Sequence, residues 1–200
     1  MKLIYAVIIA CCFMAIAACA PLQPRLQELQ LPPDRIVQKG YSLMPLNEKG
    51  WLIAGRNQYQ VALAKLGTNQ DETFAIQGMP FKLPEFQSKE EFISLIKEGQ
   101  AKDTDPQRFR IKTHEVVSYP KKGSNCVKSY LVTEDNAAVK RSRTSGSMIL
   151  EVLTLTCAHP KNTSVGVNVT YSHRYYPKQV STEFIEKATN VIDSFEFSDL

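Results

Sequence analysis

Cysteine and histidine offer the widest chemistry in this chain, and they stand close together at Cys157-Ala158-His159. Side chains two positions apart on a strand share a face, so this pair could hold one metal ion, with His114 and His173 completing a zinc site. The spacing matches no zinc template, however, and Cys157 has a better partner in Cys126. We therefore expect no metal site and no cofactor. The same competition argues against a cysteine nucleophile activated by histidine.

Cys126 and Cys157 are instead predicted to form a disulfide across a hairpin. Cys126 opens one predicted strand and Cys157 closes the next, and their midpoint falls between Arg141 and Ser142, in a polar segment suited to a turn. A hairpin with this centre places the two cysteines directly opposite each other, at a Cα separation of about 4.5–5.5 Å that a disulfide can span. Two free thiols are the alternative.

Glu151 is the one charged residue in the otherwise apolar segment 148–157. It is either a buried acid with a raised pKa or the partner of a base on a neighbouring strand, for which Lys128 and Arg174 are the candidates. Together with His159 and His173, it supplies the only side chains that we would assign to an enzyme. We predict no catalytic residue, and these three side chains are the candidates only if the protein is an enzyme.

Two surfaces could bind a partner. A hairpin-centred group of basic residues, offset by Glu134 and Asp135, could meet anionic lipid or an acidic protein, although a solvated loop would look the same. A tyrosine-rich segment near 171–176 is typical either of an interface or of a lid over the core. The basic group is Lys121, Lys122, Lys128, Lys140, Arg141 and Arg143, and the aromatic group is Tyr171, Tyr175 and Tyr176 beside His173 and Arg174.

The N-terminus has the pattern of an export signal. Lys2 is followed by residues 3–18 without a charge, a run shorter than the about 20 apolar residues that a membrane span needs. The segment Ile16-Ala17-Ala18-Cys19 resembles the bacterial lipobox. That resemblance implies a signal peptide over residues 1–18 and a Cys19 that carries a diacylglyceryl group and an acylated amino group, with palmitate as a typical chain. An uncleaved anchor helix and a cut after Ala20 are the alternatives.

The lipobox resemblance also implies a location. Two or more acyl chains hold a protein stably on a membrane, so Cys19 would be the membrane contact. In Gram-negative lipoproteins an aspartate after the cysteine favours the inner membrane, and this chain has Ala20 there. We therefore expect an outer-membrane lipoprotein that faces the periplasm.

Composition limits the remaining chain to one modest domain. The formal net charge of +4 is too small to indicate nucleic-acid binding. Residues 19–35 hold the lipidated cysteine and a proline-rich tether, and residues 36–200 are long enough for a single domain with its own core.

The element pattern predicts an α+β domain with an antiparallel sheet and flanking helices. We expect residues 41–44 and 50–53 to pair as the first two strands, followed by strands at 59–66 and 73–76. A capping box at Ser88 and Glu91 begins a helix that Gly99 ends. The other expected strands are 109–113, 126–133, 148–157 and 165–172, and an apolar stripe of Phe184, Ile185, Ala188, Val191, Ile192 and Phe195 marks a final helix that packs on the sheet.

This order resembles the Mog1/PsbP-like α/β/α sandwich proteins over about residues 41–198. The resemblance includes the Gly50-Trp51 strand, the capped helix, the segment Tyr171-Ser172-His173-Arg174 and the closing residues 191–197. It implies a binding or assembly factor and transfers no catalytic motif. We predict a non-catalytic binding or assembly module of the cell envelope, whose partner is another envelope protein or an anionic lipid. The alternatives are an envelope-acting hydrolase and a carrier of a small apolar ligand between sheet and helix.

Overall fold

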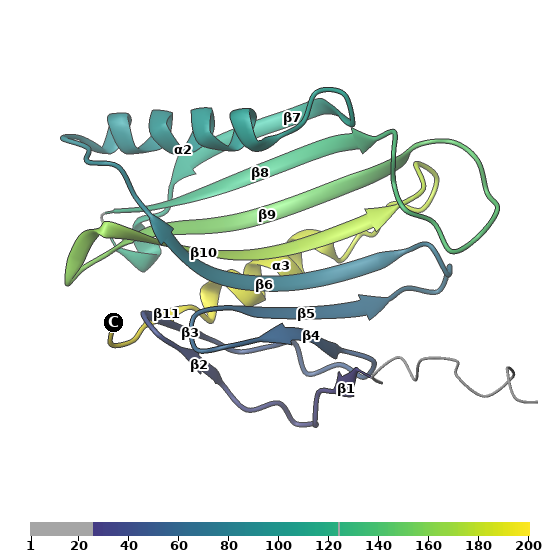
Figure 1. The fold of residues 1–200 in the computed structure, drawn as a ribbon, viewed down its shortest axis with the longest axis horizontal. Coiled ribbons are helices and arrows are strands. Elements are labelled where there is room, and N and C mark those ends of the chain that lie inside the picture. Colours follow the sequence, from purple (N-terminus) through teal and green to yellow (C-terminus); the bar gives the residue numbers. More distant parts are fainter. Residues whose placement is uncertain (1–25, 124) are drawn as a thin grey trace, which may run out of the picture.

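The computed structural model describes residues 26–123 and 125–200, which form a curved antiparallel sheet with one helix on each face (Figure 1). Cys19 and the expected signal peptide lie outside the described residues. The elements are β1 Gln27–Glu28, β2 Ile36–Gln38, β3 Tyr41–Leu43, β4 Leu52–Arg56, β5 Val61–Leu66, β6 Thr73–Lys82, α2 Lys89–Asp103, β7 Phe109–Ser118, the short 3₁₀ helix η1 Pro120–Lys122, β8 Cys126–Asp135, β9 Met148–His159, β10 Asn162–Tyr175, α3 Phe184–Asp193 and β11 Glu196–Phe197.

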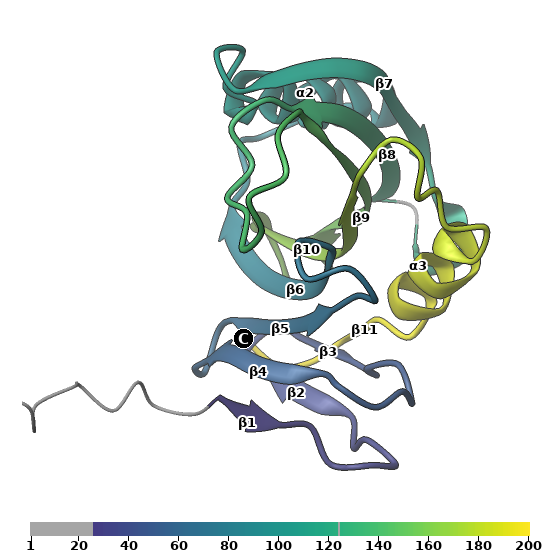
Figure 2. The same ribbon diagram turned by 90° about the vertical axis from the view of Figure 1, so that its right-hand side faces the viewer.

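Eight strands form the main sheet in the order β1-β4-β5-β6-β10-β9-β8-β7, and β11-β3-β2 form a small second sheet. Consecutive side chains on a strand point to opposite faces, so the two helices can be assigned from their contacts. Phe184 and Ile192 of α3 belong to the core that contains Leu155, whereas Phe92 of α2 packs with Val127. Cys126, the neighbour of Val127, belongs to the α3 core, so α2 and α3 cover opposite faces, as Figure 2 also shows. The predicted α+β class is confirmed.

The first strand pair was predicted wrongly. Residues 41–43 form β3, which pairs with β2 and β11 and not with the strand at residues 52–56. The cause is a two-residue turn at Lys39 and Gly40, whose positive φ of 90° suits glycine and closes a β2–β3 hairpin. The strand that follows, β4, pairs with β5 on one side and with β1 on the other.

The helix α2 starts where expected and ends later. Ser88 caps it, since its Oγ accepts from the Glu91 N–H at 3.0 Å, but the Glu91 carboxylate accepts from the N–H of Gln87 and not of Ser88. Gly99 lies inside the helix, which continues to Asp103. An interior glycine costs a helix about 1 kcal/mol, which the packing of Phe92 and Ile96 on the sheet outweighs.

Both faces of β9 are covered, as predicted, because it lies between β8 and β10 with a helix on each side. The stripe on α3 also packs on the sheet, with one exception: Ile185 is 52 % exposed. On β7, the register with β8 is irregular between Ile111 and Thr113, and Ile111 is 43 % exposed.

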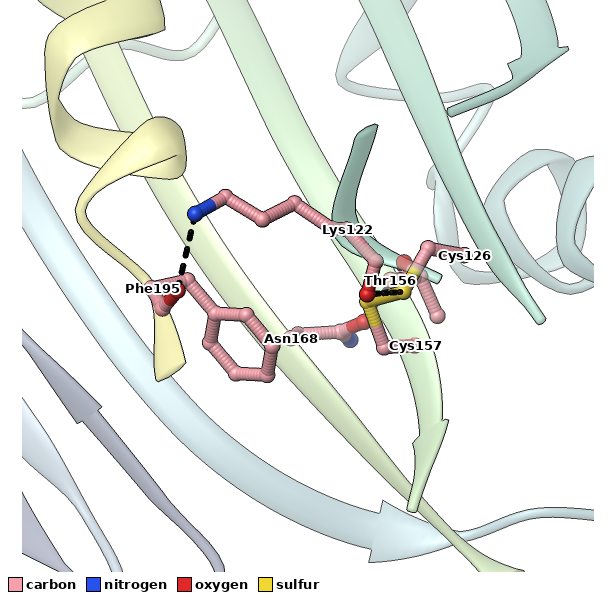
Figure 3. Close-up of a disulfide and its surroundings, with 6 residues drawn as sticks. All are labelled: Lys122, Cys126, Thr156, Cys157, Asn168 and Phe195. Atoms are coloured by element: carbon pink, nitrogen blue, oxygen red, sulfur yellow. Dashed lines mark hydrogen bonds between the residues drawn. A yellow bond between two sulfur atoms is a disulfide. The ribbon is translucent and has the colours of Figure 1, made fainter. Parts of the chain in front are cut away.

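The disulfide between Cys126 and Cys157 is confirmed (Figure 3). The two residues are direct register partners on β8 and β9, and their Cα atoms are 4.1 Å apart. The two side chains are 2 % and 0 % exposed. The disulfide therefore joins two central strands from within the core.

Candidate functional site

A cavity of about 550 Å³ opens at the ends of β6 and β10. Its walls are mainly apolar and come from four separate parts of the chain: the β6 and β10 ends, the loop between β4 and β5, the turn between β2 and β3, and residue 200. The lining residues are Lys39, Tyr59, Pro80, Phe81, Lys82, Asn162, Ser164, Val165 and Leu200.

The 57–60 loop presents Tyr59 at this cavity because its backbone is firmly held. The Asn57 side chain accepts from the N–H groups of Tyr59 and Gln60, both at 2.8 Å. The amide of Gln38 donates to the carbonyls of Asn57 at 2.5 Å and Gln60 at 2.7 Å. Hydrogen bonds from two side chains therefore hold the backbone of the turn that carries Tyr59, and the Tyr59 side chain is 42 % exposed.

Phe81 forms the wall because the opposite strand carries a glycine. A Cβ atom at Gly166 would lie 2.3 Å from the Phe81 ring, so only glycine allows the ring to lie across β10. This close approach leaves Phe81 and Val165 half-buried beside each other at the cavity wall.

Two lysines give the cavity a positive charge. Among the described residues, neither Lys39 nor Lys82 makes an ion pair; the ammonium group of Lys39 lies 5.8 Å from the centre of the Tyr59 ring. The lining residues include no carboxylate side chain, and the nearby Asp199 pairs with Lys161 at 2.5 Å. The site therefore combines apolar walls with two free ammonium groups.

A second cluster of titratable groups lies deep on the α3 face. The Nε2–H of His173 donates to Glu72 Oε1 at 2.8 Å, and the imidazole stacks between Phe74 and Tyr175 at centroid distances of 4.2 and 4.4 Å. Burial lowers the pKa of His173, against the opposing effect of the hydrogen bond and charge of Glu72. This imidazole is fully buried, so it is held neutral.

Glu151, predicted either to be a buried acid or to pair with Lys128 or Arg174, lies opposite His173 in the β9–β10 register and is 6 % exposed. Its carboxylate accepts from the hydroxyls of Tyr130 at 2.6 Å and Tyr175 at 3.2 Å, so the pairing with a base was wrong. Burial and the Glu151 carboxylate raise the pKa of Tyr175 to about 12.

A cavity of about 350 Å³ adjoins this cluster, with Glu72 in its wall. It also contains Glu48, whose carboxylate pairs with Lys65 at 2.6 Å and Lys187 at 2.9 Å. Two carboxylates and two ammonium groups thus neutralise each other within this cavity. His173 is not among its lining residues.

His159, the remaining histidine considered for catalysis, lies at the opposite end of β9. Its Nε2 donates to the Ser198 carbonyl oxygen at 3.0 Å, because a carbonyl oxygen can only accept. His173 and Glu151 are therefore brought together, but His159 is not. Within residues 26–123 and 125–200, no three His, Cys, Asp or Glu side chains cluster as a metal site.

The predicted basic group divides into two. Lys121, Lys122 and Lys128 lie near the disulfide end of β8, where Lys121 pairs with Asp193 at 2.5 Å and Lys122 donates to the Phe195 carbonyl at 3.0 Å (Figure 3). Lys140, Arg141 and Arg143 lie in the 136–147 loop beyond the other end. A ten-residue strand separates the two groups by about 30 Å. Binding of an anionic partner there stays a prediction.

The tyrosine-rich segment belongs to the core. Tyr171 and Tyr175 are 1 % and 5 % exposed, and the Tyr176 hydroxyl donates to Asp71 at 2.8 Å. Asp71 also accepts from the backbone N–H groups of Arg141 and Ser142, at 2.6 and 2.7 Å. This clamp joins the 67–72 turn to the 136–147 loop.

Sequence reasoning missed the residues of the β6–β10 cavity. The dipeptide Lys39-Gly40 indicates a β-hairpin, since a two-residue turn that ends in glycine between two apolar runs is typical of one. The convergence of Tyr59, Phe81 and Leu200 has no such signal, because it depends on long-range pairing.

Among the described residues, no helix has the length and apolar character to cross a membrane. Comparison with the models of known protein families and with curated proteins finds no match to this chain.

Proposed function

We propose that this protein is a lipid-anchored binding or assembly module of the bacterial cell envelope, held on the outer membrane by Cys19 and facing the periplasm. The Ile16-Ala17-Ala18-Cys19 segment supports the anchor, and a disulfide between buried strands suits an oxidising compartment. We also propose a Mog1/PsbP-like α/β/α sandwich, because a helix packs on each face of one antiparallel sheet.

The cavity with Lys39 and Lys82 carries the binding part of this proposal. An apolar cavity with a few polar groups at its mouth is typical of a binding site, and about 550 Å³ falls within the range of small-molecule pockets. By contrast, the histidine and carboxylates that could serve a hydrolase are buried and engaged with Glu72, Tyr130 and Tyr175. The geometry favours binding over catalysis.

The anchor would hold this domain close to the membrane. The described chain joins the sheet already at Gln27, through β1, and Leu29 packs against the core. Gln27 is only eight positions after Cys19, and an extended chain of eight residue steps spans at most about 29 Å. In Figure 1, β1 lies toward one end of the sheet and the C-terminus, beside the cavity, toward the other. The cavity residue Leu200 would then lie at the end of the sheet away from β1.

Photo-crosslinking in living cells tests the binding role. A photoreactive phenylalanine analogue replaces Tyr59, at the cavity, and in a control strain replaces Val180, which is 68 % exposed and does not line the cavity. We expect a discrete adduct from position 59 and none from position 180. Equal labelling from both positions, or no adduct at position 59, would contradict the proposal.

The anchor has its own test. Mass spectrometry of the mature protein should find an acylated N-terminal Cys19, and Cys19→Ala should release the protein from membranes. An unmodified Cys19, or a mature chain that begins at Pro21, would contradict lipidation.

A further inference from the structure

We infer that the cavity at the ends of β6 and β10 binds a single alkyl chain that ends in an anionic oxygen head group. This inference rests on the proposed binding function, because it names the ligand class of the same cavity. Two features carry it: the apolar walls and the two unpaired ammonium groups.

The apolar walls select an alkyl chain. Pro80, Phe81 and Val165 line the cavity together with Tyr59 and Leu200, which are 42 % and 41 % exposed. A chain laid between them would remove both side chains and its own methylene groups from water, at about 0.8 kcal/mol for each buried methylene. A separate hollow of about 170 Å³ is lined by Gln77, Gly78 and the 42 % exposed Met79 of β6, which precede Pro80 and Phe81 on the same strand.

The charges select an anionic head. Lys39 and Lys82 are cations with no counter-ion among the described residues, and no acidic side chain lines the cavity. Asn162 adds an amide to the lining: its Oδ1 accepts from Ser164 N and Oγ at 3.1 and 2.7 Å, so its NH₂ group is the part that can donate to a ligand. A carboxylate or phosphate accepts hydrogen bonds from both donor types, and charge-assisted bonds of this kind are the strong ones.

The second cavity provides an internal comparison. Glu48 and Glu72 line it together with Lys65 and Lys187, and Glu48 already pairs with both lysines. An anion entering there would meet two carboxylate side chains, whereas no acidic side chain lines the β6–β10 cavity. Of the two cavities, the charge pattern therefore assigns the anionic ligand to the β6–β10 cavity.

Native mass spectrometry of the full-length lipoprotein, released from a non-ionic detergent, tests the inference. The probes are dodecanoate, dodecyl phosphate and the neutral dodecanol. We expect one dodecanoate or dodecyl phosphate per chain and much weaker retention of dodecanol. The tighter of the two anions identifies the head group. Equal retention of dodecanol, or no retention of either anion, would overturn the inference.

Matched variants locate the site. Lys39→Gln with Lys82→Gln should weaken anion binding by about ten-fold or more for each ammonium group removed. The control pair Lys97→Gln with Lys102→Gln removes the same charge from α2, away from the cavity, and should leave binding unchanged. Equal losses in both pairs would mean non-specific attraction and would also overturn the inference. A protein adduct at position 59 without anion binding would leave the proposed function standing and reject this ligand class alone.

Discussion

His173 donates to Glu72 across 101 positions of sequence, and this one contact joins β10 to the turn before β6 inside the core. The imidazole is fully buried, and its Nδ1 has no hydrogen-bond partner among the described residues. An ionised carboxylate can only accept, so Nε2 carries the hydrogen and Nδ1 is the bare acceptor of a neutral ring. Protonation would place an unsatisfied N–H in an apolar stack between Phe74 and Tyr175.

Stability should therefore fall on acidification below about pH 6.5. Burial lowers the pKa of His173 in the folded protein, while an unfolded histidine has a pKa of about 6.5. Below that pH the unfolded chain binds a proton that the folded chain does not, so the free energy of unfolding decreases as pH falls toward the folded pKa. The limiting slope is about 1.4 kcal/mol per pH unit, and above pH 7 the effect is absent. Urea unfolding at pH 5, 6 and 7 measures it.

His173→Phe should flatten this slope, although it also lowers stability at every pH because Glu72 loses a donor. His114 is the matched control: burial and Lys97 lower its pKa too, and its Nε2 lies 3.0 Å from Gln100. His114→Gln should remove only its own part of the slope. A slope unchanged by His173→Phe would show that the buried imidazole is not responsible.

Much of the fold followed from local patterns. The disulfide register was predictable because a hairpin fixes pairing by symmetry about its turn, and Cys126 and Cys157 sit symmetrically about residues 141–142. The start of α2 was predictable because the Ser88 cap is a local contact. The stripe on α3 was predictable because periodicity records which face is buried.

The candidate site could not be predicted in the same way. Tyr59, Phe81 and Leu200 converge through the pairing of β6 with β10 and the return of the C-terminus to Gly40, and no spacing along the chain encodes these contacts. The partner of Glu151 was missed for a related reason: Tyr130 and Tyr175 lie across two strand pairs, and tyrosine hydroxyls compete with bases as donors inside a core.

Asp71→Asn should loosen the 136–147 loop. Burial alone would raise the pKa of Asp71, but hydrogen bonds from Ser142, Tyr176 and the Arg141 N–H outweigh it and hold the pKa well below its usual range. This contribution is full above the unfolded pKa of about 3.9 and is lost as pH falls toward the folded value. The variant should have a lower melting temperature and faster amide exchange across 136–147. Asp103→Asn, at the exposed end of α2, should change neither; protected amides in the Asp71 variant would argue against the clamp.

Removal of the disulfide should lower stability substantially. The cysteines are 31 positions apart, and the chain-entropy model assigns about 3.5–4 kcal/mol to a loop of this size. The double variant Cys126→Ser, Cys157→Ser should melt at a lower temperature. In the native protein without reductant, iodoacetamide should label neither cysteine. Labelling of both cysteines in the native protein, with an unchanged melting temperature in the variant, would refute the disulfide.

The first described strand should contribute to stability despite its two residues. Leu29 packs on the core, and its N–H donates to the Trp51 carbonyl at 2.8 Å. A chain that starts at Leu26 should keep the melting temperature, whereas one that starts at Gln30 should lose about 1–2 kcal/mol of unfolding free energy because Leu29 and the β1–β4 pairing are gone. Equal melting temperatures for the two chains would mean that residues 26–35 act as a tether and do not stabilise the domain.

Two glycine substitutions should act in opposite directions. A Cβ atom at Gly67 would lie 2.0 Å from Glu72 Oε2, and this carboxylate is held by the Thr68 N–H at 3.0 Å and by His173. Gly67→Ala must displace it and should lose about 1–3 kcal/mol. Gly99 is exposed within α2 and would have no atom within 4 Å of its Cβ, so Gly99→Ala should gain about 0.5–1 kcal/mol through helix propensity. Urea midpoints measure both. Because Gly67→Ala displaces the Glu72 carboxylate, it should also weaken the hydrogen bond between His173 and Glu72. If the unfolding free energy of this variant kept its normal dependence on pH, the turn and the imidazole would not be coupled.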